Sequence, residues 1–287
     1  MKTLVQISDP HFGTEDRRVL AGLLRDLEGV TAPRPDVLAI SGDLTQRARV
    51  SQFQAARAFL DRLDLPFVVV PGNHDVPLYN MFNRLFRPLD RYKQYITDDL
   101  APTYFDNELA VIGIDTAHGF TIKDGRVTDA HTTQICAQLG SHHTRWRVLV
   151  AHHPFVMPLG AKERDLVNGA HDAVKKLEAC GIDVILTGHM HVPYTTDAAG
   201  YAAGEGEVIA VHAGTCLSTR LRGEPNGYNR LEFAGEQLTI VHRIWDGEQF
   251  VDGPSNVYQR RKRAGAPGAT RFEQVERHEG AHVPVPA

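Results

Sequence analysis

Cysteine is scarce in this sequence of 287 residues, and its three cysteines, Cys136, Cys180 and Cys216, are not arranged for metal binding. No pair has the Cys-x-x-Cys spacing of a zinc knot or a redox motif, and the number is odd. Each cysteine lies in apolar or predicted helical surroundings. We therefore expect reduced thiols and a cytoplasmic location.

Long apolar runs and a strong net charge are also missing. No run approaches the roughly 20 apolar residues of a membrane span, and the first predicted strand starts too close to Met1 for a signal peptide. The net charge of −4 gives no electrostatic reason to bind nucleic acid or a membrane. With 42% hydrophobic and 23% charged residues, the composition is typical of a soluble globular enzyme.

What the sequence does contain is a set of short apolar runs that end abruptly at polar residues. Runs bounded by Gly or Pro, rich in β-branched residues, predict buried strands, here at 4–8, 37–41, 67–70, 148–151 and 184–187. The polar residues that follow these runs are Asp9, His11, Asp43, Asn73, His74, His152, His153, His189 and His191. Ligand groups sit beyond the carboxyl ends of strands in open α/β sheets. The pattern therefore predicts one polynuclear metal site.

The other predicted elements place this site in an α/β domain. Strands and helices alternate over the first 75 residues, which predicts parallel α/β structure. Helices are expected at 17–28, from Ser51 to Leu63, at 129–139 and at 170–180, and further strands at 103–105, 109–115, 207–213, 228–233 and 237–244. Residues 76–101 and 154–169 are expected to form loops or short helices near the site. We expect a domain over residues 1–258 and a flexible tail over 259–287, where the chain turns basic and then Pro/Gly-rich.

Two segments place ligands one residue apart, Asp9-x-His11 and His189-x-His191. In extended backbone, residues i and i+2 face the same way, so each pair can converge on one ion. Gly42 and Gly72 allow tight turns close to the ions. A donor set of oxygen and nitrogen without thiolate suits manganese, iron or zinc. A bridging carboxylate would join two such ions about 3.5–4 Å apart.

Taken together, these motifs resemble the calcineurin-like metallophosphoesterase superfamily, and their spacing is most similar to bacterial class III cyclic-nucleotide phosphodiesterases. The resemblance covers residues 3–191 and is carried by Asp9-x-His11, Gly42-Asp43, Gly72-Asn73-His74-Asp75, His152 and Gly188-His189-x-His191. It implies a fold of two facing mixed β-sheets flanked by helices, a four-layer α/β sandwich.

The same resemblance implies a role for each residue. One ion would be held by Asp9, His11, Asp43 and His191, and the other by Asp43, Asn73, His152 and His189. Asp43 would bridge the two ions, and His152 rather than His153 matches the family ligand because it lies two residues before Pro154. His74 would contact the substrate phosphate and protonate the leaving oxygen. An alternative role for His74 is only to orient Asp43.

One departure from the family pattern bears on the substrate. Phosphoprotein phosphatases of this superfamily have a second Asp where this chain has Gln46, and a Glu where it has Asp75. The resemblance thus favours hydrolysis of small-molecule phosphodiesters by a metal-bridging hydroxide over protein dephosphorylation. A phosphomonoesterase and a non-catalytic scaffold are the alternatives, and a homodimer is one possible assembly. Contacts to substrate from Arg47, Asp115, Arg220 and Arg222 are left open.

A second metal-binding pattern lies near the carboxyl end. Residues His278-Glu279-Gly280-Ala281-His282 match the His-Glu-x-x-His pattern of metallopeptidases. That chemistry needs a stable helix that presents both histidines on one face. Gly280 lies inside the segment, and Pro284 and Pro286 follow it. We therefore expect no peptidase site here.

Overall fold

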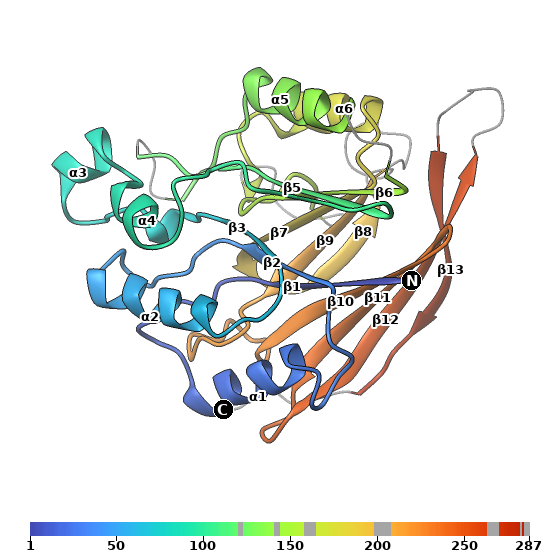
Figure 1. Cartoon of the computed structure of the whole chain (residues 1–287), viewed down its shortest axis with the longest axis horizontal. Helices are drawn as coiled ribbons and strands as arrows, with labels where there is room; N and C mark the ends of the chain where they lie inside the picture. The colour runs from blue at the N-terminus through green and yellow to red at the C-terminus, as the bar shows by residue number, and fades with distance from the viewer. Residues whose placement is uncertain are drawn as a thin grey trace.

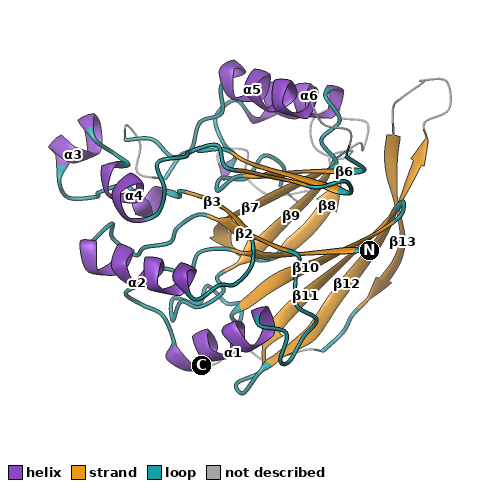
Figure 2. Cartoon of the chain, viewed as in Figure 1, coloured by secondary structure: helices purple, strands orange, loops and turns teal. Residues whose placement is uncertain are grey.

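Two mixed β-sheets face each other in the computed structural model, with helices on their outer faces (Figures 1 and 2). The structure describes residues 1–119, 123–140, 144–157, 165–197, 208–262, 270–281 and 283. The first sheet has the strand order β13-β12-β11-β10-β1-β2-β3 and the second β4-β5-β6-β7-β9-β8. The predicted fold class is confirmed.

The first sheet combines a parallel half with an antiparallel half. Its parallel strands are β1 (Lys2–Ile7), β2 (Val37–Ser41) and β3 (Phe67–Val70). The antiparallel ladder on the other side of β1 consists of β10 (Gly227–Ala234), β11 (Gln237–Trp245), β12 (Phe250–Lys262) and β13 (Thr270–His278).

The second sheet is parallel at its centre and antiparallel at both edges. The central strands are β5 (Leu109–Gly113), β6 (Trp146–Val150), β7 (Val184–His191) and β9 (Ile209–Gly214). The edge strands are β4 (Thr103–Phe105) and β8 (Tyr194–Asp197).

Helices cover the outer face of each sheet. Those of the first half are α1 (Arg17–Leu27), α2 (Val50–Asp61), the 3₁₀ turn η1 (Asn73–Asp75), α3 (Met81–Phe86) and α4 (Asp90–Tyr95). Helices α5 (Asp129–Gly140) and α6 (Ala170–Ala179) lie side by side over the second sheet (Figure 1). Among the described residues, no helix is long and apolar enough to cross a membrane.

Strands buried on both faces explain why the apolar runs were so clear in the sequence. On β2, Leu38 and Ile40 pack against α1 and α2, whereas Val37 and Ala39 face the other sheet. On β6, Leu149 packs under α5 and α6 while its neighbours face the first sheet. Three apolar layers therefore hold the strand ends, and the loops that follow them, in fixed positions.

We expected a flexible tail from residue 259 onward, and this prediction is wrong for residues 259–262 and 270–278. The predicted domain boundary at 258 falls inside β12. These residues complete β12 and form β13, which pair antiparallel. Arg260 lies 3.9 Å above the ring of Trp146, and Phe272 stacks on the same ring at 5.7 Å. The charged composition hid this hairpin because most side chains of β13 face solvent.

The expectation of reduced thiols is also wrong for two cysteines. Cys136 on α5 and Cys180 at the end of α6 form a disulfide, with their Cα atoms 5.5 Å apart. Cys216 is a buried free thiol. The pairing depends on how two helices pack, which a separation of 44 residues along the chain does not reveal. The cysteines therefore no longer support a reducing, cytoplasmic compartment.

Candidate metal centre

The predicted ligands lie in the turns that follow β1, β2, β3 and β6 and in the last residues of β7. Six non-glycine residues in the described part of the chain have positive φ, namely Asp9, His11, Asp43, Ala48, His189 and His191. Five of these six are predicted ligands. Such backbone is strained for non-glycine residues and persists only where the surroundings enforce it, which is typical of functional sites.

Backbone hydrogen bonds between the turns enforce this conformation. The amide of Asp9 donates to the carbonyl of Gly42 (3.2 Å), and the amide of His11 donates to the carbonyl of Asp43 (3.1 Å). Thr215, after β9, donates its hydroxyl to the carbonyl of Asp9 (2.6 Å). The loops after β1, β2 and β9 therefore form one rigid unit.

The first group of ligand atoms comes from Asp9, His11 and His191, which are all buried. The Nε2 atoms of the two histidines are 3.1 Å apart, and Asp9 Oδ1 lies 3.1 Å from His191 Nε2 and 3.6 Å from His11 Nε2. Asp9 Oδ1 is buried, and among the described residues only these two imidazoles interact with it. A buried carboxylate oxygen and two facing imidazole nitrogens fit a shared cation.

The second group of ligand atoms comes from Asn73, His152 and His189. Asn73 Oδ1 lies 3.1 Å from His152 Nε2 and 2.9 Å from His189 Nδ1. The other ring nitrogen of His152, Nδ1, donates to the carbonyl of Ser41 (2.7 Å). This arrangement fixes Nε2 toward the group and is typical of metal-ligating histidines.

Asp43 lies between the two groups. Its Oδ2 is 3.7 Å from His11 Nε2, and its Oδ1 is 3.4 Å from His152 Nε2. One carboxylate therefore presents an oxygen to each group, as a bridging ligand must.

The charges of the centre also fit cations. Burial alone would raise the pKa of Asp9, but His191 and His11 outweigh burial and hold that pKa well below its usual range. Burial opposes the charge of Asp43 too, yet His152 and His74 lower its pKa strongly. Burial would lower the pKa of His152, but the Asp43 carboxylate raises it to about 9. Two carboxylates thus stay ionised in a buried site, which requires protons or metal ions beside them.

Asp75 and Gly72 hold the turns around the Asp43 carboxylate. Asp75 accepts hydrogen bonds from the amides of Gly72 (3.0 Å), Leu44 (3.1 Å) and Thr45 (2.8 Å), which joins the turns after β2 and β3. A Cβ on Gly72 would lie 2.2 Å from Asp43 Oδ1. Only glycine leaves room for the carboxylate at that position.

His74 lies beside Asp43, and one of its ring nitrogens clusters with ligand atoms of His11 and Asp43, although the resemblance does not imply that it is a ligand. Its amide donates to Asp43 Oδ1 (2.8 Å), and its ring lies 4.8 Å from that of His11. His74 Nδ1 is 2.8 Å from the carbonyl of Gln46, which can only accept, so Nδ1 carries the proton of this bond. The backbone of Gln46 therefore orients His74 where phosphoprotein phosphatases use an Asp side chain.

Asp115, Arg47, Arg220 and Arg222, whose contacts to substrate were left open, do not belong to the clusters of ligand atoms found among the described residues. Asp115 accepts a hydrogen bond from the amide of Ala117 (2.7 Å) in its own turn, and burial raises its pKa to about 7. Arg47 lies over the ring of the exposed Tyr79, 5.7 Å from its centroid. Arg220 and Arg222 are exposed.

Sequence reasoning missed two threonines. Thr116 contacts His153, and Thr215 contacts Asp9. Single threonines carry no positional signal in a sequence.

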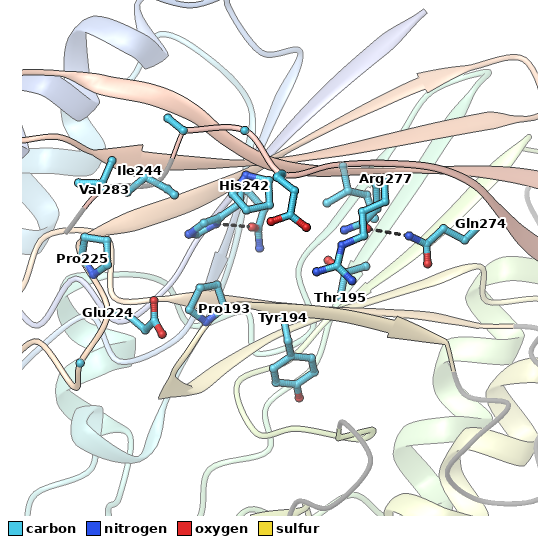
Figure 3. A pocket seen from close by; sticks show the side chains of 18 residues that line it. Pro193, Tyr194, Thr195, Glu224, Pro225, His242, Ile244, Gln274, Arg277 and Val283 are labelled. Carbon is cyan, nitrogen blue, oxygen red and sulfur yellow. Dashed lines mark hydrogen bonds between the residues drawn. The ribbon is translucent and has the colours of Figure 1, made fainter. Parts of the chain in front are cut away.

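A separate cavity of about 690 Å³ lies between β8 and the strands β11 to β13 (Figure 3). Within it, His242 Nδ1 lies 2.9 Å from Asn229 Oδ1, and Gln274 donates to Asn256 (2.9 Å). Arg277 projects into the same space (Figure 3). Among the described residues that line this cavity, no three His, Cys, Asp or Glu side chains converge. The centre at the strand ends is therefore the better candidate site.

Comparison with known proteins places this centre in a family. The family model for calcineurin-like phosphoesterases matches residues 2–193. Glycerophosphodiester phosphodiesterase GpdQ of Enterobacter lignolyticus is 29% identical over 180 residues, which are 56% of this chain and 60% of that protein. A probable cyclic nucleotide phosphodiesterase of Synechococcus is 26% identical over 205 residues, 66% of this chain and 73% of that protein.

A solved structure has the same fold. GAP50, the anchor in the inner membrane complex of Plasmodium, has a TM-score of 0.54 at 13% identity and covers 97% of this chain and 88% of its own. The family model covers more than half of the chain and contains every predicted ligand. The chain therefore belongs to the calcineurin-like phosphoesterase family.

Proposed function

We propose that this protein hydrolyses small-molecule phosphodiesters with the help of two metal ions. The observation that carries the proposal is the position of Asp43, whose two carboxylate oxygens face two different groups of ligand atoms. A single-metal site would not need a carboxylate shared in this way.

The two groups assign the ligands. Asp9, His11, Asp43 and His191 would hold the first ion, and Asp43, Asn73, His152 and His189 the second. The donor set of nitrogen and oxygen suits manganese, iron or zinc. When bound, the two ions supply an activated water and neutralise the charge of the phosphate.

His74 would supply the proton for the leaving group. His74 presents Nε2 next to the bridge because Nδ1 is held by the carbonyl of Gln46. A proton on Nε2 can pass to the leaving alkoxide, which a diester releases and which is a poor leaving group without protonation. The hydrogen bond that the His74 amide donates to Asp43 Oδ1 (2.8 Å) fixes the position of His74 relative to the proposed bridging carboxylate.

The preference for diesters follows from charge. A dianionic monoester brings one more negative charge than a diester, and sites specialised for it usually add arginines. The only arginine adjacent to one of the metal-binding motifs is Arg47, which lies over Tyr79. Two relatives are named as phosphodiesterases, which supports the same choice.

The test compares two model substrates. With manganese added to the purified protein, kcat/KM for bis-nitrophenyl phosphate should exceed kcat/KM for mono-nitrophenyl phosphate. A clear preference for the monoester would make the protein a phosphomonoesterase with the same centre. No hydrolysis of either ester by a protein loaded with two ions would favour a non-catalytic scaffold.

A further inference from the structure

His153 lies next to the predicted ligand His152, although the resemblance to the family assigns it no role. It is buried, with 2% of its surface exposed. Its ring centroid lies 4.9 Å from that of His152 and 4.8 Å from that of His189. His153 therefore borders the two histidines of the second group of ligands.

The two ring nitrogens of His153 have different surroundings. Nδ1 lies 2.8 Å from the hydroxyl of Thr116, and the backbone of Lys123 also interacts with this imidazole. Nε2 is buried and has no hydrogen-bond partner among the described residues. Buried polar atoms without a partner are rare in native proteins and call for an explanation such as a missing ion. His152 shows the same arrangement, with Nδ1 bound to the carbonyl of Ser41 and Nε2 directed at the centre.

The three histidines converge. Ligand atoms of His152, His153 and His189 all lie within 4.8 Å of one another. Imidazole nitrogens bind zinc at about 2.0–2.1 Å in tetrahedral geometry, so two nitrogens that share one ion are roughly 3.3 Å apart. Nitrogens that lie within 4.8 Å of one another reach that spacing when they approach by at most about 1.5 Å.

We propose that His153 is an additional ligand, through Nε2, of the ion that Asn73, His152 and His189 hold. The inference rests on the proposed dinuclear centre. With His153 the second ion has three imidazole ligands, whereas the first has two imidazoles and two carboxylates. Imidazole suits zinc, iron and cobalt, and carboxylates suit manganese. The second position should therefore prefer zinc or cobalt over manganese more strongly than the first.

The test measures metal binding directly and does not depend on catalytic activity. The chelator-treated protein is titrated with Co²⁺, then with Zn²⁺ and Mn²⁺, by calorimetry and, for Co²⁺, by visible absorption. In His153→Gln the first ion should bind as in the wild type, and the second should bind Co²⁺ and Zn²⁺ at least about 10-fold more weakly. The loss for Mn²⁺ should be smaller, and the cobalt spectrum of the second site should change.

Two further variants separate ligation from packing. Thr116→Val removes the hydrogen bonds of the Thr116 hydroxyl to His153 Nδ1 (2.8 Å) and to the His153 amide (3.4 Å) but leaves the imidazole in place. It should therefore weaken the second ion less than His153→Gln does. His242→Gln changes a histidine of the separate cavity and should leave both ions unaffected. If His153→Gln does not fold, the wild-type cobalt form still decides, because a third imidazole adds a paramagnetically shifted N–H signal in its proton NMR spectrum.

The outcomes distinguish this inference from the proposed function. Two ions bound by His153→Gln with wild-type affinity and an unchanged cobalt spectrum would show that His153 only packs against the ligands. A wild-type cobalt form with only two imidazole N–H signals from the second ion would overturn the inference as well. A wild-type protein that binds no second ion at all would instead overturn the dinuclear centre.

Discussion

At the scale of single residues, the centre depends on side chains held in strained backbone. Asp9, His11, Asp43, His189 and His191 have positive φ, and hydrogen bonds from neighbouring loops stabilise each turn. Gly188 shows how tight this arrangement is, because a Cβ there would lie 1.8 Å from Ser8 Oγ and 2.6 Å from Asp9 Oδ2. Ser8 in turn donates to Asp9 Oδ2 (2.6 Å). Small residues therefore position the ligands as much as the ligands' own strands do.

The bridging role of Asp43 is tested by Asp43→Asn. The amide keeps the size of the side chain but removes the charge that serves both groups, so both ions should bind weakly or not at all. Metal content of the purified variant, measured by elemental analysis, checks this. Asn73→Ala is the matched control and should weaken chiefly the second ion. Two tightly bound ions in the Asp43→Asn protein would rule out a shared bridge.

The role of His74 is tested by His74→Ala. The variant should keep both ions and the fold, but its turnover should fall by about 10²–10⁴-fold, the usual contribution of a positioned proton donor. The loss should be smaller for esters with a nitrophenolate leaving group than for alkyl esters, because nitrophenolate needs little protonation. An equal loss across leaving groups would favour the alternative role, in which His74 only orients Asp43.

How much of the site could be predicted differs between kinds of residue. The convergence of the candidate ligands was predictable because each follows an apolar run that only a buried strand explains. Asp75, Thr116 and Thr215 act through hydrogen bonds across loops far apart in sequence. Their partners become visible only in three dimensions, since no local pattern marks them.

At the scale of elements, the central strands were predictable and the last hairpin was not. Strands β2, β3 and β6 are buried on both faces, so nearly every residue is apolar and the signal is strong. Strand β13 forms the edge of the first sheet, and most of its side chains face solvent. Its apolar anchor is essentially Phe272, and one aromatic residue in a charged segment does not predict a strand.

The contribution of the hairpin is tested by Phe272→Ala. Phe272 stacks on Trp146 and is nearly fully buried, so its loss should lower the free energy of unfolding by about 3 kcal/mol. Val275→Ala, at an exposed position of the same strand, should stay within about 0.5 kcal/mol of the wild type. Thermal unfolding of both variants provides the comparison. Equal Tm values for the two variants would mean that the hairpin does not stabilise the domain.

At the scale of the whole molecule, the two sheets are joined by more than apolar packing. Asp183 lies just before β7 in the second sheet, and Arg260 lies on β12 in the first. Arg260 Nη2 is 2.8 Å from Asp183 Oδ2, and the amide of Arg147 donates to the same oxygen (2.8 Å). Both side chains of the pair are about nine-tenths buried. The ion pair therefore links the two sheets next to the hairpin of β12 and β13, which the sequence did not predict.

This link gives the stability of the protein a defined pH dependence. Burial raises the pKa of Asp183 from 3.8 to about 6, although Arg260 and the amide of Arg147 partly oppose the shift. The folded state thus binds this proton more tightly than the unfolded state. The extra stability is fully present below about pH 4 and is lost as the pH rises through about 6.

Asp183→Asn should remove this dependence, because an amide cannot ionise but still accepts a hydrogen bond. The variant should match the wild type near pH 4 and become more stable than the wild type by on the order of 2–3 kcal/mol near pH 7. Tm measured from pH 4 to pH 7 for both proteins checks the sign, with the exposed Asp98→Asn as control. If the Tm difference stays constant across this range, Asp183 is not the titrating group. If it changes in the opposite direction, Arg260 stabilises the ionised form more than burial destabilises it.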